Sequence, residues 1–132
     1  MVVTGEHVAR WVMSKIGSYT ENMTGVGWEV NGELVAGTAF ENFNSNNMFG
    51  HQRIDSSPPR FYWFALAHYI FIQCKVKRFT ATVEANNAKA IRLNKHIGFV
   101  IEATLKDAGR EGDLLVMTLW KENCRMLDWG SK

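Results

Sequence analysis

The order of helical and strand-like patterns along this chain predicts a mixed α/β fold, with one sheet and helices on both of its faces. Three observations indicate it. Two strand patterns flank an Asn-Gly pair, as in a β-hairpin. A long apolar helix pattern separates these early strands from the later ones. Near the C-terminal third, a strand pattern, a capped helix pattern and another strand pattern follow one another. The expected order is helix, three strands, helix, strand, helix and two strands.

The first expected element is a helix over Glu6–Ile16. Val8, Trp11, Val12 and Ile16 recur at helical spacing and would form one apolar face. Thr4 is expected to cap the start of this helix, and Gly17 is expected to end it.

Three strands are expected next, over Gly25–Val30, Glu33–Phe43 and Met48–Ile54. Asn31-Gly32 favours a type I′ turn between the first two, because both central residues of that turn need a positive φ. The segment Asn44–Asn47 is expected to turn the chain into the third strand. These three strands would be antiparallel neighbours.

A second helix is expected over Arg60–Lys75, after a break at Asp55–Pro59. Proline is tolerated at a helix start because the first N–H groups have no partner within the helix. The strand Arg78–Glu84 should follow. Aromatic residues lie all around this helix, which fits burial against the sheet and a second contact surface, such as that of a homodimer. They are Phe61, Tyr62, Trp63, Phe64, Tyr69 and Phe71.

The last helix should begin after Asn87, which can cap it, and end at Gly98, which can adopt a left-handed conformation. Its apolar stripe consists of Ala90, Ile91, Leu93 and Ile97. The strands Val100–Leu105 and Leu114–Trp120 are expected to follow, joined by a polar loop.

Composition indicates one globular domain, residues 1–132, in which 46% of the residues are hydrophobic. Fifteen basic and 13 acidic residues give a net charge of only +2, which argues against nucleic acid binding. Cys74 and Cys124 lack metal-ligand spacing, so no metal is expected. Two lone cysteines fit a reducing compartment, so a cytoplasmic location is expected. The apolar run Phe61–Ile72 is too short to span a membrane.

Residue identities between Glu84 and Phe99, read as EANNAKAIRLNKHIGF, go beyond a generic strand–helix–strand unit. This segment resembles the GCN5-related N-acetyltransferase (GNAT) family, and Gly112-Asp113 with Met117–Leu119 resembles the end of its ribosomal-protein-alanine type. The segments AFENFNSNNMFGH and KENCRML are similar to small GNAT-like proteins of bacteriophages and prophages. The resemblance covers about residues 25–127.

This resemblance implies a GNAT-like fold and an enzyme that transfers an acetyl group from acetyl-coenzyme A to an amine of a small molecule or protein. The coenzyme would lie where Met48–Ile54 and Arg78–Glu84 separate, with its pyrophosphate at the start of the next helix. The alternative is a binding or interaction module that keeps the fold without catalysis.

The family's phosphate loop contains glycines, whereas the equivalent segment here, RIDSSPPR at 53–60, contains none. Ser56 and Ser57 could supply hydroxyl groups, and Arg53 and Arg60 could supply charge. The competing interpretation is a helix start with a rigid Pro-Pro entry. A second departure is Asn94, which occupies the place of a family tyrosine. Its amide could contact the coenzyme sulfur but could not donate a proton to it at neutral pH.

His51 is the best candidate for a catalytic base, because it is expected at the end of the strand that would line the cleft, three residues past Met48, and imidazole titrates near neutral pH. A strand histidine without a role is the alternative, and Glu41 is a second candidate base. By resemblance, Asn87 could also touch the pantetheine arm. Lys95 and Arg92 could reach the coenzyme phosphates, or simply form a solvated helix face.

Overall fold

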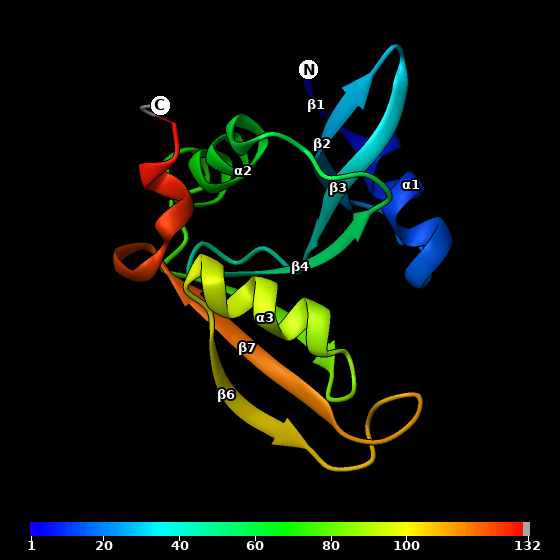
Figure 1. Cartoon of the computed structure of the whole chain (residues 1–132), viewed down its shortest axis with the longest axis vertical. Helices are drawn as coiled ribbons and strands as arrows, with labels where there is room; N and C mark the ends of the chain where they lie inside the picture. The colour runs from blue at the N-terminus through cyan, green and yellow to red at the C-terminus, as the bar shows by residue number, and fades with distance from the viewer. Residues whose placement is uncertain (131–132) are drawn as a thin grey trace.

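A seven-stranded mixed sheet runs through the protein, in the strand order β1-β2-β3-β4-β5-β7-β6 (Figure 1). The computed structural model describes residues 1–130. The strands are β1 Val2–Thr4, β2 Thr24–Val30, β3 Glu33–Glu41, β4 Asn47–Ile54, β5 Arg78–Glu84, β6 Val100–Leu105 and β7 Leu114–Trp120. The α-helices are α1 Glu6–Ile16, α2 Arg60–Ala67 and α3 Ala88–Ile97. The β4–β5 pair is parallel and the other neighbours are antiparallel.

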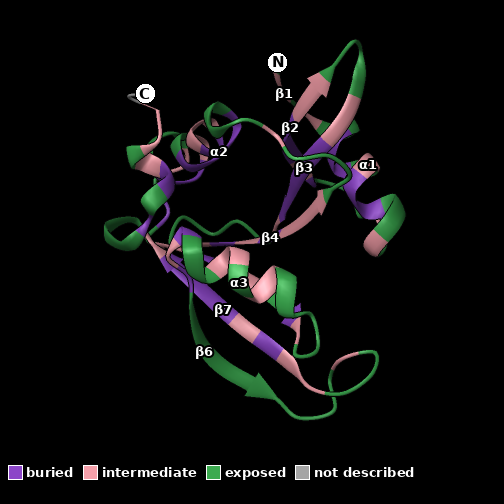
Figure 2. Cartoon of the chain, viewed as in Figure 1, coloured by how far each residue is buried: buried purple, intermediate pink, exposed green. Residues whose placement is uncertain are grey.

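Helices cover both faces of the sheet, as the sequence predicts. On one face, Val8 and Val12 of α1 pack in one cluster with Ala39 of β3. The next residue, Phe40, points to the opposite face because side chains alternate along a strand. There it belongs to a larger core with Tyr62 of α2, and the apolar residues of α3 pack against the same core. Figure 2 shows buried residues along α2 and β7, while the edge strand β6 is exposed.

The predicted hairpin between β2 and β3 is confirmed. Asn31 and Gly32 have φ values of 51° and 82°, so both adopt the left-handed conformation that this turn requires. The predicted bounds of α1, β5, α3, β6 and β7 are also those of the structure. Asn87 caps α3, since its Oδ1 accepts a hydrogen bond from the Ala90 N–H at 3.1 Å. Gly98 follows α3 with φ 126°.

The N-terminal strand β1 was not predicted, and the cap assigned to Thr4 is wrong. Thr4 is the last residue of β1 and pairs with Val26. Gly5 occupies the cap position of α1, and no side chain in the described part of the chain caps that helix. A run of three residues is too short for periodicity to identify. Its strand conformation depends on the neighbouring β2, which only the tertiary fold supplies.

The second helix changes type along its length. It begins at Arg60 as predicted, but after Ala67 it continues as a π-helix over His68–Gln73. The Cys74 N–H then donates to Tyr69 O at 2.9 Å, one residue further back than in an α-helix. Two short 3₁₀ helices, Lys121–Asn123 and Arg125–Asp128, follow β7 and were not predicted. None of the described helices is both long and apolar enough to cross a membrane.

Candidate active site between β4 and β5

The hydrogen-bonded pairing of the two parallel strands stops halfway along β4. Parallel partners run from Asn47 with Arg78 to Gly50 with Ala81. Beyond this point β4 continues beside β3 alone, as far as Ile54. β5 continues beside β7 alone. The two strands therefore separate as the sequence analysis expected, and the edge of residues 51–54 that faces β5 has no strand partner within residues 1–130.

A phenylalanine ring fills the point where the strands part. A Cβ atom added to Gly50 would lie 2.1 Å from Cζ of Phe79, so the ring occupies the space that a side chain at position 50 would need. The centroid of the Phe79 ring is 5.8 Å from that of Phe40 and 5.9 Å from that of Phe99. Three rings thus form an apolar floor on the face of the sheet covered by α2 and α3.

His51 is the first residue of β4 beyond the last β5 pair, and it faces the α1 side. It is directly opposite Ala39, which packs against α1. Its Nε2 lies 2.9 Å from Oε1 of Glu41, and both side chains are partly buried, with 25% and 29% of their areas exposed. A carboxylate bound to one ring nitrogen fixes the orientation and tautomer of the imidazole. The pair therefore places an imidazole of fixed orientation at the point where the strands separate.

His51 and Glu41 are separate candidates in the sequence, and their contact was not predicted. The signal was present in the hairpin register, because Glu41 pairs with Phe49 and Ala39 pairs with His51. His51 is two residues from Phe49 on the same face of the sheet, so it is the diagonal neighbour of Glu41. Without the turn geometry, that register could not be assigned.

Arg53 does not join the expected phosphate contacts. Like His51 it points to the α1 face, where its guanidinium stacks 3.8 Å from the centroid of Trp11 and donates to Trp11 O at 2.8 Å. It also binds both carboxylate oxygens of Asp55, at 3.0 and 2.8 Å. The hydrogen bonds from Arg53 lower the pKa of Asp55 below its ordinary value. Arg53 therefore fastens α1 to β4, because side-chain alternation turns it away from α2.

Ser56, Ser57 and Arg60 do lie together, in the segment that enters α2, and all three are exposed. Pro59 holds the cap position of α2, and no side chain among residues 1–130 caps that helix. The Ser56 N–H is already donated to Val35 O at 3.1 Å. An anion at this helix start would meet hydroxyl groups, the Arg60 guanidinium and the first N–H groups of α2. Arg60 also lies over the ring of Trp129, 5.4 Å from its centroid.

The two asparagines of α3 have identified hydrogen-bond partners. Asn94 is half-buried, and its amide donates to the sulfur of Met117 at 3.7 Å, so it points toward the sheet. Asn87 uses its Oδ1 to cap the helix. Neither contact involves β4. Both residues remain candidates for coenzyme contact through their remaining polar groups.

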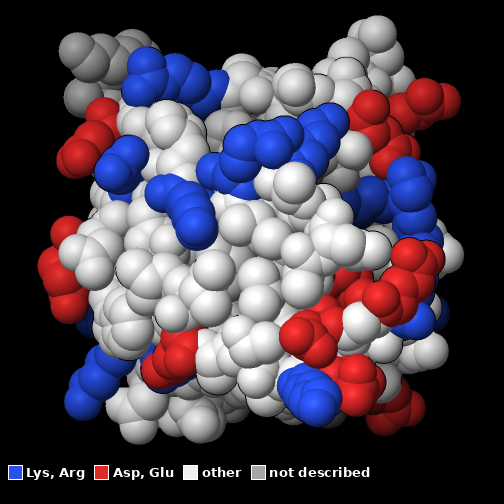
Figure 3. Space-filling view, turned by 60° about the horizontal axis from the view of Figure 1, so that its bottom comes forward, with Lys and Arg blue, Asp and Glu red and all other residues white. Residues whose placement is uncertain are grey.

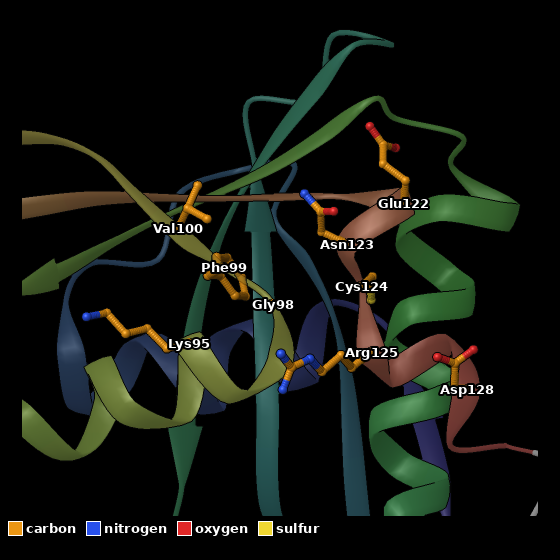
Figure 4. Close-up of a pocket in the computed structure, with 9 residues that line it drawn as sticks. All are labelled: Lys95, Gly98, Phe99, Val100, Glu122, Asn123, Cys124, Arg125 and Asp128. Carbon is orange, nitrogen blue, oxygen red and sulfur yellow. The ribbon is translucent and has the colours of Figure 1, made fainter.

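Lys95 lines a different cavity, of about 550 Å³, at the C-terminal end of α3 (Figure 4). Its walls come from the start of β6 and from the 3₁₀ helices, with Arg125 reaching toward α3. No residue of β4, β5 or the start of α2 lines this cavity within the described chain. Trp129, over which Arg60 lies, stacks on His96, the neighbour of Lys95, so this end of α3 is linked to the start of α2 through one ring.

Charge is unevenly distributed over the surface. Figure 3 shows lysine and arginine in a band across the upper part of one face, with acidic residues at the sides of this face and in its lower part. Lys89, Arg92 and Lys95 are exposed at intervals of three along α3, and the helix carries no acidic residue in its first turn. A small net charge therefore conceals a local excess of positive charge on α3.

Solved acetyltransferase structures resemble this protein over most of its length. A mutant form of the spermidine/spermine N-acetyltransferase SpeG from Vibrio cholerae aligns over 92% of this chain and 95% of its own, with 15% identity and a TM-score of 0.74. The ribosomal-protein-alanine N-acetyltransferase from Brucella melitensis aligns over 76% and 70%, with 23% identity and a TM-score of 0.58.

YncA from Salmonella typhimurium, described as a putative acetyltransferase with its cofactor acetyl-CoA, aligns over 76% of this chain and 65% of its own, with 21% identity and a TM-score of 0.62. No protein-family model matches the sequence, and no curated protein matches it. At these identities the likeness is one of fold. The protein has the GNAT-like fold that the sequence analysis predicted.

Proposed function

We propose that this protein, which has the fold of the N-acetyltransferases described above, transfers an acetyl group from acetyl-CoA to an amine. One observation carries the proposal. Pairing between β4 and β5 ends at Gly50 and Ala81, which leaves one edge of β4 open directly beside the His51–Glu41 pair. An open strand edge and a proton acceptor thus meet at one point.

The open edge of residues 51–54 suits the amide groups of the pantetheine arm, which could pair with it as an added strand would. Ser56, Ser57 and Arg60 would meet the phosphates at the start of α2. Asn87 and Asn94 of α3 would flank the arm from the other strand. Arg53 is left out of this set, because its guanidinium is bound to α1. Lys95 stays a prediction of the sequence for the coenzyme phosphates.

His51 would take a proton from the incoming ammonium group, and Glu41 would hold the imidazole in the orientation that this transfer needs. The neutral amine then attacks the thioester carbonyl carbon. A C–N bond forms, the C–S bond breaks and the sulfur leaves as a thiolate. The nitrogen gives up its second proton to water as the amide forms, and water supplies a proton to the thiolate, since the Asn94 amide has none to give at neutral pH.

The acceptor is proposed at the level of an amine, in a small molecule or a protein. One structure with this fold is SpeG in complex with CoA and spermine, at 17% identity and a TM-score of 0.66. Another is named a ribosomal-protein-alanine acetyltransferase. These names make polyamines and protein amino groups the first acceptors to test. A cytoplasmic location, a phage origin and a homodimer stay predictions of the sequence.

A non-catalytic binding module is the second candidate, and the entry to α2 favours it. Residues 53–60 contain no glycine, and two prolines there have no N–H to offer a phosphate. The second candidate therefore predicts weak or no binding of the coenzyme at this segment.

Calorimetry with acetyl-CoA distinguishes the two candidates. We expect saturable binding by the wild type and about tenfold weaker binding by Arg60→Ala, since a lost charge-assisted contact costs roughly 1.4 kcal/mol. The matched control is Lys121→Ala, an exposed lysine outside the site, which should bind as the wild type does. Absence of heat and of a thermal shift at millimolar acetyl-CoA would overturn the enzyme proposal.

A further inference from the structure

The loop between β6 and β7 is fastened to the end of β5. The Ala85 N–H donates to Asp113 O at 3.0 Å, and the Arg110 N–H donates to Oε1 of Glu84 at 2.9 Å. A Cβ atom at Gly109 would lie 2.5 Å from the same carboxylate oxygen, so the loop approaches the strand very closely. This loop therefore belongs to the β5 side of the split.

The end of α1 is fastened to the end of β4 in the same way. Arg53 of β4 donates to Trp11 O, and Lys15 of α1 lies 3.6 Å from Oδ1 of Asp55. Helix α1 covers the face on which His51 lies. The C-terminus of α1 therefore belongs to the β4 side of the split.

A hydrogen bond joins these two sides. Nη2 of Arg110 donates to the backbone oxygen of Ile16 at 3.1 Å, across 94 positions of sequence. Ile16 is the last residue of α1, and the carbonyl groups of a last turn have no partner within the helix. The bond joins the end of α1 to the β6–β7 loop. Since α1 is fastened to β4 and the loop is fastened to β5, the bond indirectly connects the ends of the two separated strands on the His51 face. We call this Arg110–Ile16 hydrogen bond the latch.

We propose that Arg110 determines acceptor size, because the latch closes the wide end of the β4–β5 split on the face where the amine must meet His51. The inference rests on the proposed acetyl transfer. With the latch formed, the opening admits slender amines. With the latch broken, the ends of β4 and β5 are no longer tied, and bulkier amines can approach His51. Arg110 acts here as a positioning residue.

The guanidinium of Arg110 is not needed to keep its own loop in place. The bond from Arg110 to Glu84 comes from the backbone N–H, and the bond between Ala85 and Asp113 involves backbone atoms alone. Arg110→Ala therefore removes the latch and leaves both attachments of the loop to β5. Arg110→Lys keeps a cationic donor of similar length.

The test compares a slender and a bulky acceptor, propylamine and a hexapeptide with a free α-amino group. Release of coenzyme A is followed with a thiol reagent. We expect Arg110→Ala to raise kcat/KM for the hexapeptide at least fivefold relative to propylamine. Arg110→Lys and Lys106→Ala, an exposed lysine at the start of the same loop, should keep the wild-type ratio. An unchanged ratio in Arg110→Ala overturns the inference.

A second measurement needs no acceptor. Modification of His51 by diethyl pyrocarbonate, resolved by mass spectrometry, should be several-fold faster in Arg110→Ala, while His7 on α1 reacts at its wild-type rate. If the wild type acetylates neither probe, the proposed function fails on these substrates and His51 reactivity alone decides the latch. Equal His51 rates in the two proteins would then overturn it.

Discussion

Strand β4 consists of two halves with different surroundings. Residues 47–50 all pair with β5, and the last two of them also pair with β3. Among the described residues 1–130, residues 51–54 have strand partners only in β3. One half is built into the sheet, and the other offers an edge to a ligand.

Polar side chains fasten the first half to its neighbours. Arg78 donates to Oε2 of Glu102 at 3.1 Å and to Oγ1 of Thr118 at 2.8 Å. Thr80, also bound by Arg78, donates to Oδ1 of Asn47 at 2.6 Å. These bonds link four strands where β4 and β5 begin.

The second half is held by uncharged polar side chains that connect it to β3 and α2. Gln52 donates to Thr38 at 3.2 Å, and the Thr38 hydroxyl lies 3.0 Å from that of Tyr62 in α2. Tyr62 also donates to Val26 O, and burial raises the pKa of its hydroxyl. A strand can therefore lose one row of backbone bonds and stay in place when buried side chains fix it from the helix side.

The largest expected effect is on chemistry in the unpaired half. His51→Ala should lower kcat by about 10²- to 10⁴-fold, because it removes the general base. Binding of acetyl-CoA and the melting temperature should stay close to those of the wild type, since the backbone edge is unchanged. Steady-state kinetics with an amine that the wild type acetylates, together with calorimetry, checks this.

Glu41→Gln serves as the companion variant to His51→Ala. It removes the charge but keeps a hydrogen-bond acceptor beside His51 and leaves the imidazole itself in place, so its loss in kcat should be smaller than that of His51→Ala. A His51→Ala enzyme with the wild-type kcat would remove His51 from the mechanism.

A smaller effect is expected on stability in the paired half. Gly50→Ala places a Cβ atom within the Phe79 ring, and that ring is 4% exposed and cannot move freely. We expect a loss of about 1–3 kcal/mol in the free energy of unfolding, measured by urea denaturation. Adding Phe79→Leu to Gly50→Ala should recover part of the loss. If the losses of the single variants Gly50→Ala and Phe79→Leu simply add in the double variant, the contact with the ring is not the cause.

The smallest effect is a pH dependence at the start of the paired half. Hydrogen bonds from Arg78, and then from Thr118, lower the pKa of Glu102 from its ordinary value of 4.5 to about 2. A lowered pKa in the folded state means that the ionised carboxylate stabilises the protein above pH 4.5. That contribution is lost as the pH falls toward 2.

The variant Glu102→Gln isolates this contribution. The difference in melting temperature between it and the wild type should be largest near pH 7 and should vanish near pH 2. It should also be small, because the carboxylate is exposed to solvent. A difference that does not change with pH would assign the effect to packing in place of charge.

Elements with local causes could be predicted from the sequence. Asn87 caps α3 through a bond to a residue three positions away, and Asn31-Gly32 sets its own turn geometry. Strand β1 and the π-helix could not be predicted in this way. The first needs β2 beside it, and the second differs from an α-helix in hydrogen bonds that reach one residue further back, which apolar periodicity does not resolve.

The candidate site divides in the same manner. His51, Glu41, Ser56 and Ser57 could be named from residue type and position. The arrangement of the candidate residues could not be predicted, since Arg53 is bound to α1 and Lys95 lines a cavity that no residue of β4 lines within the described chain. One residue of register decides which face a strand side chain occupies, and that register is a property of the paired strands.

Local sequence accounts for the order of the three α-helices and of strands β2 to β7, for the hairpin turn and for the cap of α3, because each depends on residues a few positions apart. The point where β4 leaves β5, the contact of Glu41 with His51 and the bond from Arg110 to Ile16 arise only in the folded chain. Those contacts join segments separated by up to 94 positions. Their geometry is set by sheet register and helix packing, which act only once the chain has folded.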